Sequence, residues 1–125
     1  FRSYERTCVM DNDHSICQRL AMMLDEDPSC TILIIGRYMA PVRAEYNSVR
    51  HLVRKAKLRP TIANAGHLRS VTAQHGRLEA FAPIGPARGR RASAVLHVGE
   101  RDEHIDMVLD SFRMSGAIVY TSLGV

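Results

Sequence analysis

Aromatic residues are scarce in this sequence. Phe, Tyr and Trp make up 6% of the 125 residues, and Trp is absent. Proteins that bind single-stranded nucleic acid usually stack bases on exposed aromatic side chains, and the sequence shows no cluster of this kind. Hydrophobic residues still amount to 46%, which excludes a disordered chain and suits one domain with one core.

The sequence also lacks long apolar runs and paired cysteines. No run approaches the roughly 18 residues of a membrane span, and the polar start over residues 1–6 does not resemble a signal peptide. Cys8, Cys17 and Cys30 have no CxxC spacing, so a zinc knuckle or a disulfide scaffold is not supported. We therefore expect a cytoplasmic protein with reduced thiols and no membrane partner.

Nucleotide and metalloprotease motifs are missing as well. The chain contains no GxGxxG, no P-loop and no HExxH pattern, and its six histidines are scattered. A dinucleotide-binding, NTPase or zinc-hydrolase function consequently has no motif behind it.

The charged residues are unevenly distributed along the sequence. The net charge is +4, yet residues 37–91 hold twelve basic and two acidic residues. Residues 1–36 and 92–125 are each net acidic. A basic centre between acidic ends predicts a polar interaction surface, and it would also permit self-association between opposite charges.

Hydrophobic patterning predicts alternating strands and helices. We expect strands over 7–10, 30–36, 60–64, 78–81, 94–98 and 117–121, and helices over 15–26, from 41 to about 57, over 67–75 and over 102–115. Alternation with short connections favours one α/β domain over 1–125, a three-layer sandwich with a mostly parallel sheet and helices on both faces, flavodoxin-like or receiver-like. A ferredoxin-like α+β arrangement of part of the chain is the alternative.

An acidic cluster follows the first expected strand. Asp11 and Asp13 would lie at the carboxyl end of that strand, where open α/β sheets bind ligands, and two carboxylates there could hold Mg²⁺. Asn64 and His67 would lie on the same ligand side, with His67 as a candidate general base. Turn and cap chemistry is the alternative role for the two aspartates. Apart from this Mg²⁺, the sequence implies no cofactor.

Two stretches resemble the receiver domains of response regulators. VMDNDHSICQRLAMML over 9–24 is similar to the family's first strand, acidic cluster and helix, and ILIIGRYMAP over 32–41 is similar to its third strand. In the receiver family, the phosphoacceptor Asp would fall at Gly36, the switch Ser/Thr near Ala65 and the Lys near Ile84. The resemblance therefore implies that this chain lacks the expected residue at each of these three positions. It therefore implies a non-catalytic receiver-like signalling or protein-interaction domain without aspartyl phosphorylation.

Basic residues form two candidate surfaces for anions or partners. One is the helix face with Arg43, Arg50, Arg54 and Lys57. The other is the Pro/Gly/Arg-rich segment 83–93, here called the arginine loop, with Arg88, Arg90 and Arg91. Arginine forks match phosphate and carboxylate oxygens.

Three further expectations follow from these basic residues. A nucleic-acid or polyanion-binding module using the basic 37–91 region is the first alternative function. A small α/β enzyme acting on a phosphorylated ligand is the second. Arg90-Arg91-Ala92-Ser93 also has the spacing of a basic-directed kinase site, with Ser93 as the phosphoacceptor.

Overall fold

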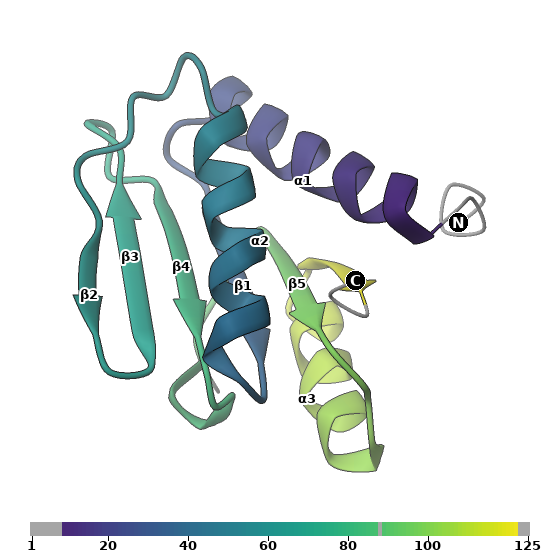
Figure 1. Ribbon diagram of the computed structural model, residues 1–125. Coiled ribbons are helices and arrows are strands. Elements are labelled where there is room, and N and C mark those ends of the chain that lie inside the picture. Colours follow the sequence, from purple (N-terminus) through teal and green to yellow (C-terminus); the bar gives the residue numbers. More distant parts are fainter. Residues whose placement is uncertain (1–8, 88, 123–125) are drawn as a thin grey trace.

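A computed structural model describes residues 9–87 and 89–122 of the chain (Figure 1). Its elements, in chain order, are α1 (Val9–Glu26), β1 (Thr31–Gly36), α2 (Met39–Leu52), β2 (Ile62–Asn64), β3 (His67–Val71), β4 (Arg77–Phe81), the short 3-10 helix η2 (Gly85–Ala87), β5 (Ala94–Val98), α3 (Glu103–Met114) and β6 (Ile118–Ser122).

The strands form one six-stranded sheet in the order β2-β3-β4-β1-β5-β6. Four neighbouring strands, β4, β1, β5 and β6, are parallel, and β3 runs antiparallel to both of its neighbours. The predicted mostly parallel α/β sheet is thus confirmed.

Helices cover both faces of this sheet. On one face, α1 and α2 bury Leu20 and Tyr46 against Ile32 and Ile34 of β1. On the other face, α3 buries apolar side chains against β1 and β5, and the arginine loop adds Ile84 and Ala87 to the same core. Strand β1 is buried on both sides and reads as a continuous apolar run, as interior parallel strands do. Figure 1 shows α2 lying in front of β1, with α3 near the carboxyl-terminal end of the chain.

The first element differs from the prediction. Val9 and Met10 begin α1 rather than ending a strand, and the helix runs unbroken through Ser15 to Glu26. Thr7 and Cys8 lie outside the described residues. Periodicity cannot separate a short apolar run in a strand from one in a helix, and the buried stripe of Ile16, Leu20 and Leu24 continues the helical pattern.

Strand β3 replaces the helix predicted over 67–75. Leu68 and Ser70 are buried while His67, Arg69 and Val71 are half-exposed, which is the period-two pattern of a strand. Ala65 and Gly66 form the turn of the β2–β3 hairpin. The helix prediction was wrong because Leu68 and Val71 also fit a helical i, i+3 spacing.

Helix α2 ends earlier than the sequence pattern implied. The Asp25 carboxylate at the end of α1 accepts hydrogen bonds from the backbone amides of Arg54, Lys55 and Ala56 at 2.7–3.2 Å. Amides held by this carboxylate do not continue the helical ladder, so α2 ends at Leu52. Among the described residues, no helix is both long and apolar enough to cross a membrane.

Candidate functional site: a pocket between the arginine loop and α3

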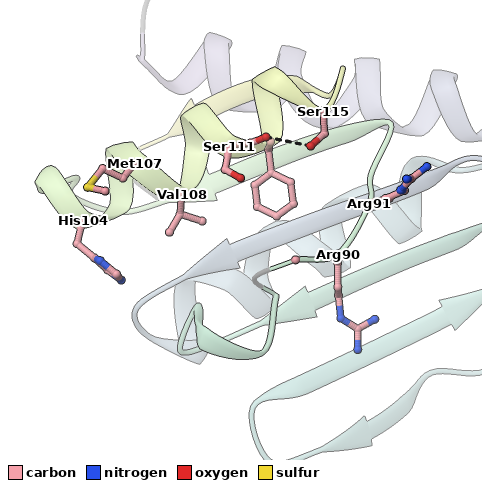
Figure 2. A pocket seen from close by; sticks show the side chains of 9 residues that line it. Arg90, Arg91, His104, Met107, Val108, Ser111 and Ser115 are labelled. Atoms are coloured by element: carbon pink, nitrogen blue, oxygen red, sulfur yellow. Dashed lines mark hydrogen bonds between the residues drawn. The ribbon is translucent and has the colours of Figure 1, made fainter.

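A pocket of about 650 Å³ lies between the arginine loop and α3 (Figure 2). The loop contributes Gly89, Arg90 and Arg91. Helix α3 and the residue after it contribute His104, Met107, Val108, Ser111, Phe112 and Ser115. We call this the α3 pocket. It combines basic, hydroxyl and apolar groups in one hollow.

Both walls of the α3 pocket are fixed by the core. Helix α3 begins at the N-cap Asp102, whose side chain accepts from the Ile105 amide at 2.8 Å. That hydrogen bond is the main cause that lowers the pKa of Asp102. The apolar stripe of this helix, Ile105, Val108, Leu109 and Phe112, is buried. In the loop, Ile84 and Ala87 are buried, and the Ala87 amide donates to the Ile84 carbonyl at 2.8 Å.

The guanidinium of Arg90 contacts residues of the sheet, although Arg90 also lines the pocket. Its guanidinium lies 3.4 Å from both carboxylate oxygens of Glu79 and 4.6 Å from the centre of the Phe81 ring. Figure 2 shows its side chain pointing away from α3. Glu79 therefore neutralises part of its charge, and Arg90 holds the arginine loop to β4.

Arg91 is the freer cation of the α3 pocket. Its side chain is exposed, and no hydrogen bond or ion pair joins it to another described residue. Arg88 lies outside the described residues. Of the three loop arginines predicted to bind an anion or partner, two therefore line one pocket, and Arg91 has its guanidinium available.

The α3 wall offers apolar and hydroxyl groups. Val108 and Phe112 are buried and form the floor, while Met107 is 70% exposed. The Ser115 hydroxyl donates to the Ser111 carbonyl at 3.0 Å (Figure 2). Met114, close to the pocket at the end of α3, is 89% exposed. Exposed methionines of this kind suit adaptable binding surfaces.

The four basic residues predicted to share one helix face do not all belong to α2. Arg43 is exposed on the helix, but Arg50 is half-buried and its Nε donates to the Ser70 hydroxyl at 2.9 Å. Arg54 and Lys57 lie beyond the end of α2 at Leu52. The prediction was wrong because it extended the helical spacing past the point where Asp25 captures the backbone amides.

The predicted strand-end site of Asp11 and Asp13 is also not formed. Both residues lie within α1 rather than after a strand, and their side chains lie outside the described part of the molecule. Among the described residues, no three His, Cys, Asp or Glu side chains are grouped to hold a metal ion.

The carboxyl ends of β1 and β5 hold a different set of groups. Arg37 pairs with Asp102 at 2.8 Å across this edge of the sheet. A Cβ on Gly36 would lie 2.7 Å from the Val98 carbonyl oxygen and 2.6 Å from Val42. Hence the position at which the receiver resemblance placed the phosphoacceptor has no room for a side chain.

Ser93 lies at the start of β5 and is exposed. Its amide donates to the Thr31 carbonyl at 2.8 Å, and its carbonyl accepts from the Ile118 amide at 3.0 Å. The Ser93 side chain is therefore exposed, with its hydroxyl accepting from the Thr31 amide at 3.4 Å, and its backbone is held between β1 and β6.

A charged cluster around Glu79 was not predicted from the sequence. Glu79 is 1% exposed, and its carboxylate lies 2.7 Å from His67 Nε2, 3.4 Å from Arg90 and 3.9 Å from Arg77. One signal was available, because Glu79 is one of two acidic residues within the basic region 37–91. Asn64 and His67, predicted to be ligand-side, are paired across β2 and β3.

His97 is a second buried group that the sequence did not single out. It is fully buried on β5, and neither ring nitrogen has a hydrogen-bond partner among the described residues. Burial, followed by the positive charge of Arg101, lowers the pKa of His97. The ring is thus neutral at pH 7.

Comparison with known proteins supports the fold alone. No protein-family model and no curated protein matches the sequence. Among solved structures, the large terminase of a thermophilic bacteriophage is similar, with a TM-score of 0.60 at 9% sequence identity. The match covers 89% of this chain and 29% of that protein, so the chain spans less than a third of its length. The shared architecture is consistent with the α/β fold described above.

Proposed function

We propose that this protein is a protein-interaction domain that binds an acidic segment of a partner protein in the α3 pocket. The observation that carries the proposal is Arg91, which has no hydrogen bond or ion pair to another described residue and lines the same pocket as the buried Val108 and Phe112. Arginine binds carboxylates through two parallel hydrogen bonds, while Val108 and Phe112 could receive one apolar side chain of the same segment.

The chemistry of the pocket favours a peptide over nucleic acid. A nucleic-acid strand needs stacking surfaces as well as cations, and the phenyl ring of the lining, Phe112, is buried. Met107 is exposed beside it and offers an adaptable contact for aliphatic side chains. In an acidic segment with interspersed Leu residues, the carboxylates would contact Arg91 and the Leu side chains would contact the apolar residues of the pocket.

Binding of model peptides tests the proposal. Fluorescence anisotropy with a labelled Glu/Leu peptide of about 12 residues should detect binding that weakens with added salt, because the contact is partly electrostatic. Arg91→Glu should weaken it by about tenfold or more, since it replaces an attraction with a repulsion.

The matched control is Arg43→Glu, which makes the same charge change at an exposed position on α2. Its effect should stay within about twofold, because screening removes interactions between distant surface charges. Equal reductions in affinity for Arg43→Glu and Arg91→Glu would mean that net charge, not the α3 pocket, attracts the peptide.

A further inference from the structure

One part of the sheet is left without a covering helix. On the α3 side, the second core contains residues of β1, β4 and β5 but none of β2 or β3. The side chains that face this way form what we call the open sheet face: Ile62, Asn64, His67, Arg69, Val71 and Arg77. All six are exposed or half-buried.

Positive charge exceeds negative charge on the open sheet face. Arg69 and Arg77 belong to it, Arg90 reaches its border, and Arg77 and Arg90 pair with the Glu79 carboxylate. Arg69 lies directly opposite Glu79 in the β3–β4 ladder, yet its Nε is buried without a partner among the described residues. Two guanidinium groups pair with this carboxylate and Arg69 lies opposite it in the ladder, so positive charge remains for a second anion.

The same face presents a ring in a fixed orientation. His67 stacks on Phe81 with ring centroids 4.3 Å apart and an angle of 8° between planes, and its Nε2 is bound to Glu79. In the ladder, Phe81 lies on one side of His67 and Asn64 on the other. Asn64 belongs to the edge strand β2 and is exposed, and the His67 side chain is itself 25% exposed, so part of the imidazole is open to solvent beside Asn64.

We propose that the open sheet face binds single-stranded nucleic acid, with a base stacked on His67 beside the Asn64 amide and phosphates at Arg69 and Arg77. Stacking tolerates any base, while an Asn amide can hydrogen-bond a base edge. The sequence lacks an aromatic cluster, and the Phe81–His67 stack supplies a flat surface despite this composition. The site lies on a different surface from the α3 pocket and does not depend on the function proposed there.

An acidic peptide fits the open sheet face less well. Ile62, at 51% exposure, is its one exposed large apolar side chain, and a peptide without apolar anchors would rely on charge pairs that are weak at a surface. A strand of nucleotides uses both the cations and the flat ring.

The test is binding of a labelled oligodeoxyadenylate of about 12 nucleotides, compared with a duplex of equal length, at about 50 and about 200 mM NaCl. We expect tighter binding of the single strand and a clear fall in affinity with salt. Arg77→Glu should weaken binding by about tenfold and lower the salt slope, by about 0.7 for each phosphate that is no longer neutralised. Arg43→Glu should change affinity by less than about twofold.

Substitution of His67 separates stacking from charge. His67→Gln keeps an amide that can hydrogen-bond Glu79 but removes the ring, and it should weaken oligonucleotide binding about tenfold, while His67→Phe should retain most of the affinity. Circular dichroism would establish that each variant is folded.

Four results would overturn the proposal. The first is the absence of binding by the wild type. The second is duplex binding as tight as that of the single strand. The third is an equal reduction in affinity for Arg43→Glu and Arg77→Glu. Displacement of the oligonucleotide by the Glu/Leu peptide in an Arg91→Glu background would likewise assign this face to a protein partner.

Discussion

Asp25 shows how one side chain shapes two elements. Its carboxylate accepts three successive backbone amides, from Arg54 to Ala56, and thereby joins the end of α1 to the segment after α2. Partial burial opposes ionisation, but the hydrogen bonds from Ala56, Arg54 and Lys55 prevail and lower the pKa of Asp25.

Asp25→Ala should therefore lower the free energy of unfolding by about 1–2 kcal/mol at pH 7, after allowance for the solvent exposure of the site. Because the folded-state pKa lies below the ordinary 3.8, this contribution is complete above that value and is lost as the pH falls through the folded-state pKa. Urea denaturation across acidic pH checks both statements. Asp110→Ala, at an exposed pair with Arg113, is the control and should cost less than about 0.5 kcal/mol.

His97 makes the opposite contribution to stability. Its pKa is lowered from 6.5 by burial and by Arg101, so the unfolded chain takes up a proton at this residue before the folded protein does. Stability should accordingly decline as the pH falls below about 6.5.

His97→Leu should make the loss of stability below about pH 6.5 smaller, because the protonation of His97 no longer contributes to it. It should also raise the free energy of unfolding at pH 7 by about 1 kcal/mol, because it removes two buried nitrogens that lack hydrogen-bond partners. Denaturant titrations near pH 7.5 and near pH 5 measure the effect, with His51→Leu on the exposed side of α2 as the control. An unchanged pH dependence in His97→Leu would contradict this prediction, because it would show that His97 has the same pKa in the folded and the unfolded chain.

At the scale of elements, the β3–β4 turn packs tightly against the α1–β1 connection. The Thr72 hydroxyl donates to the Pro28 carbonyl, and the Gly76 amide donates to the Thr72 hydroxyl at 2.9 Å. A Cβ at Gly76 would lie 2.0 Å from the Pro28 carbonyl oxygen, so the two connections cannot both keep their places with a larger residue there.

Gly76→Ala should destabilise the protein by about 2–3 kcal/mol through this backbone clash. Gly85→Ala is the matched control, because a Cβ at Gly85 meets nothing within 4 Å, and it should change stability by less than about 0.5 kcal/mol. Thermal or urea unfolding compares the two. Similar stabilities would mean that the turn and the α1–β1 connection can separate without cost.

Local pattern predicted some elements well and others poorly. Strands β1 and β5 and helix α3 were predicted correctly from their apolar patterns. The start of α1, the end of α2 and the identity of β3 depend on tertiary contacts, such as the Asp25 carboxylate and the burial of Ser70 against Tyr46. Neither contact has a signature in the local sequence.

The candidate sites divide in the same way. Arg90 and Arg91 were found because a Pro/Gly/Arg-rich loop is visible in sequence. Their neighbours on α3 were not found, since the helix packs against the loop only through the fold. Glu79 was missed because its role arises from register, which brings His67, Arg77 and Arg90 around it.

At the scale of the whole molecule, the basic centre of the sequence is divided between surfaces. Arg91 serves the α3 pocket, Arg69 and Arg77 lie on the open sheet face, and Arg43 remains on α2. Arg90 stands between the first two, bound to Glu79. The net charge of +4 therefore describes several separate surfaces and not one basic patch.

Chemical-shift mapping with the Glu/Leu peptide tests the central claim most directly, because it locates the bound segment on the molecule. The account predicts that the largest amide shifts fall on Gly89, Arg91, Ser111 and Ser115, around the α3 pocket, and that they disappear with Arg91→Glu. Shifts confined to β2 and β3, or spread evenly over exposed basic residues, would contradict it.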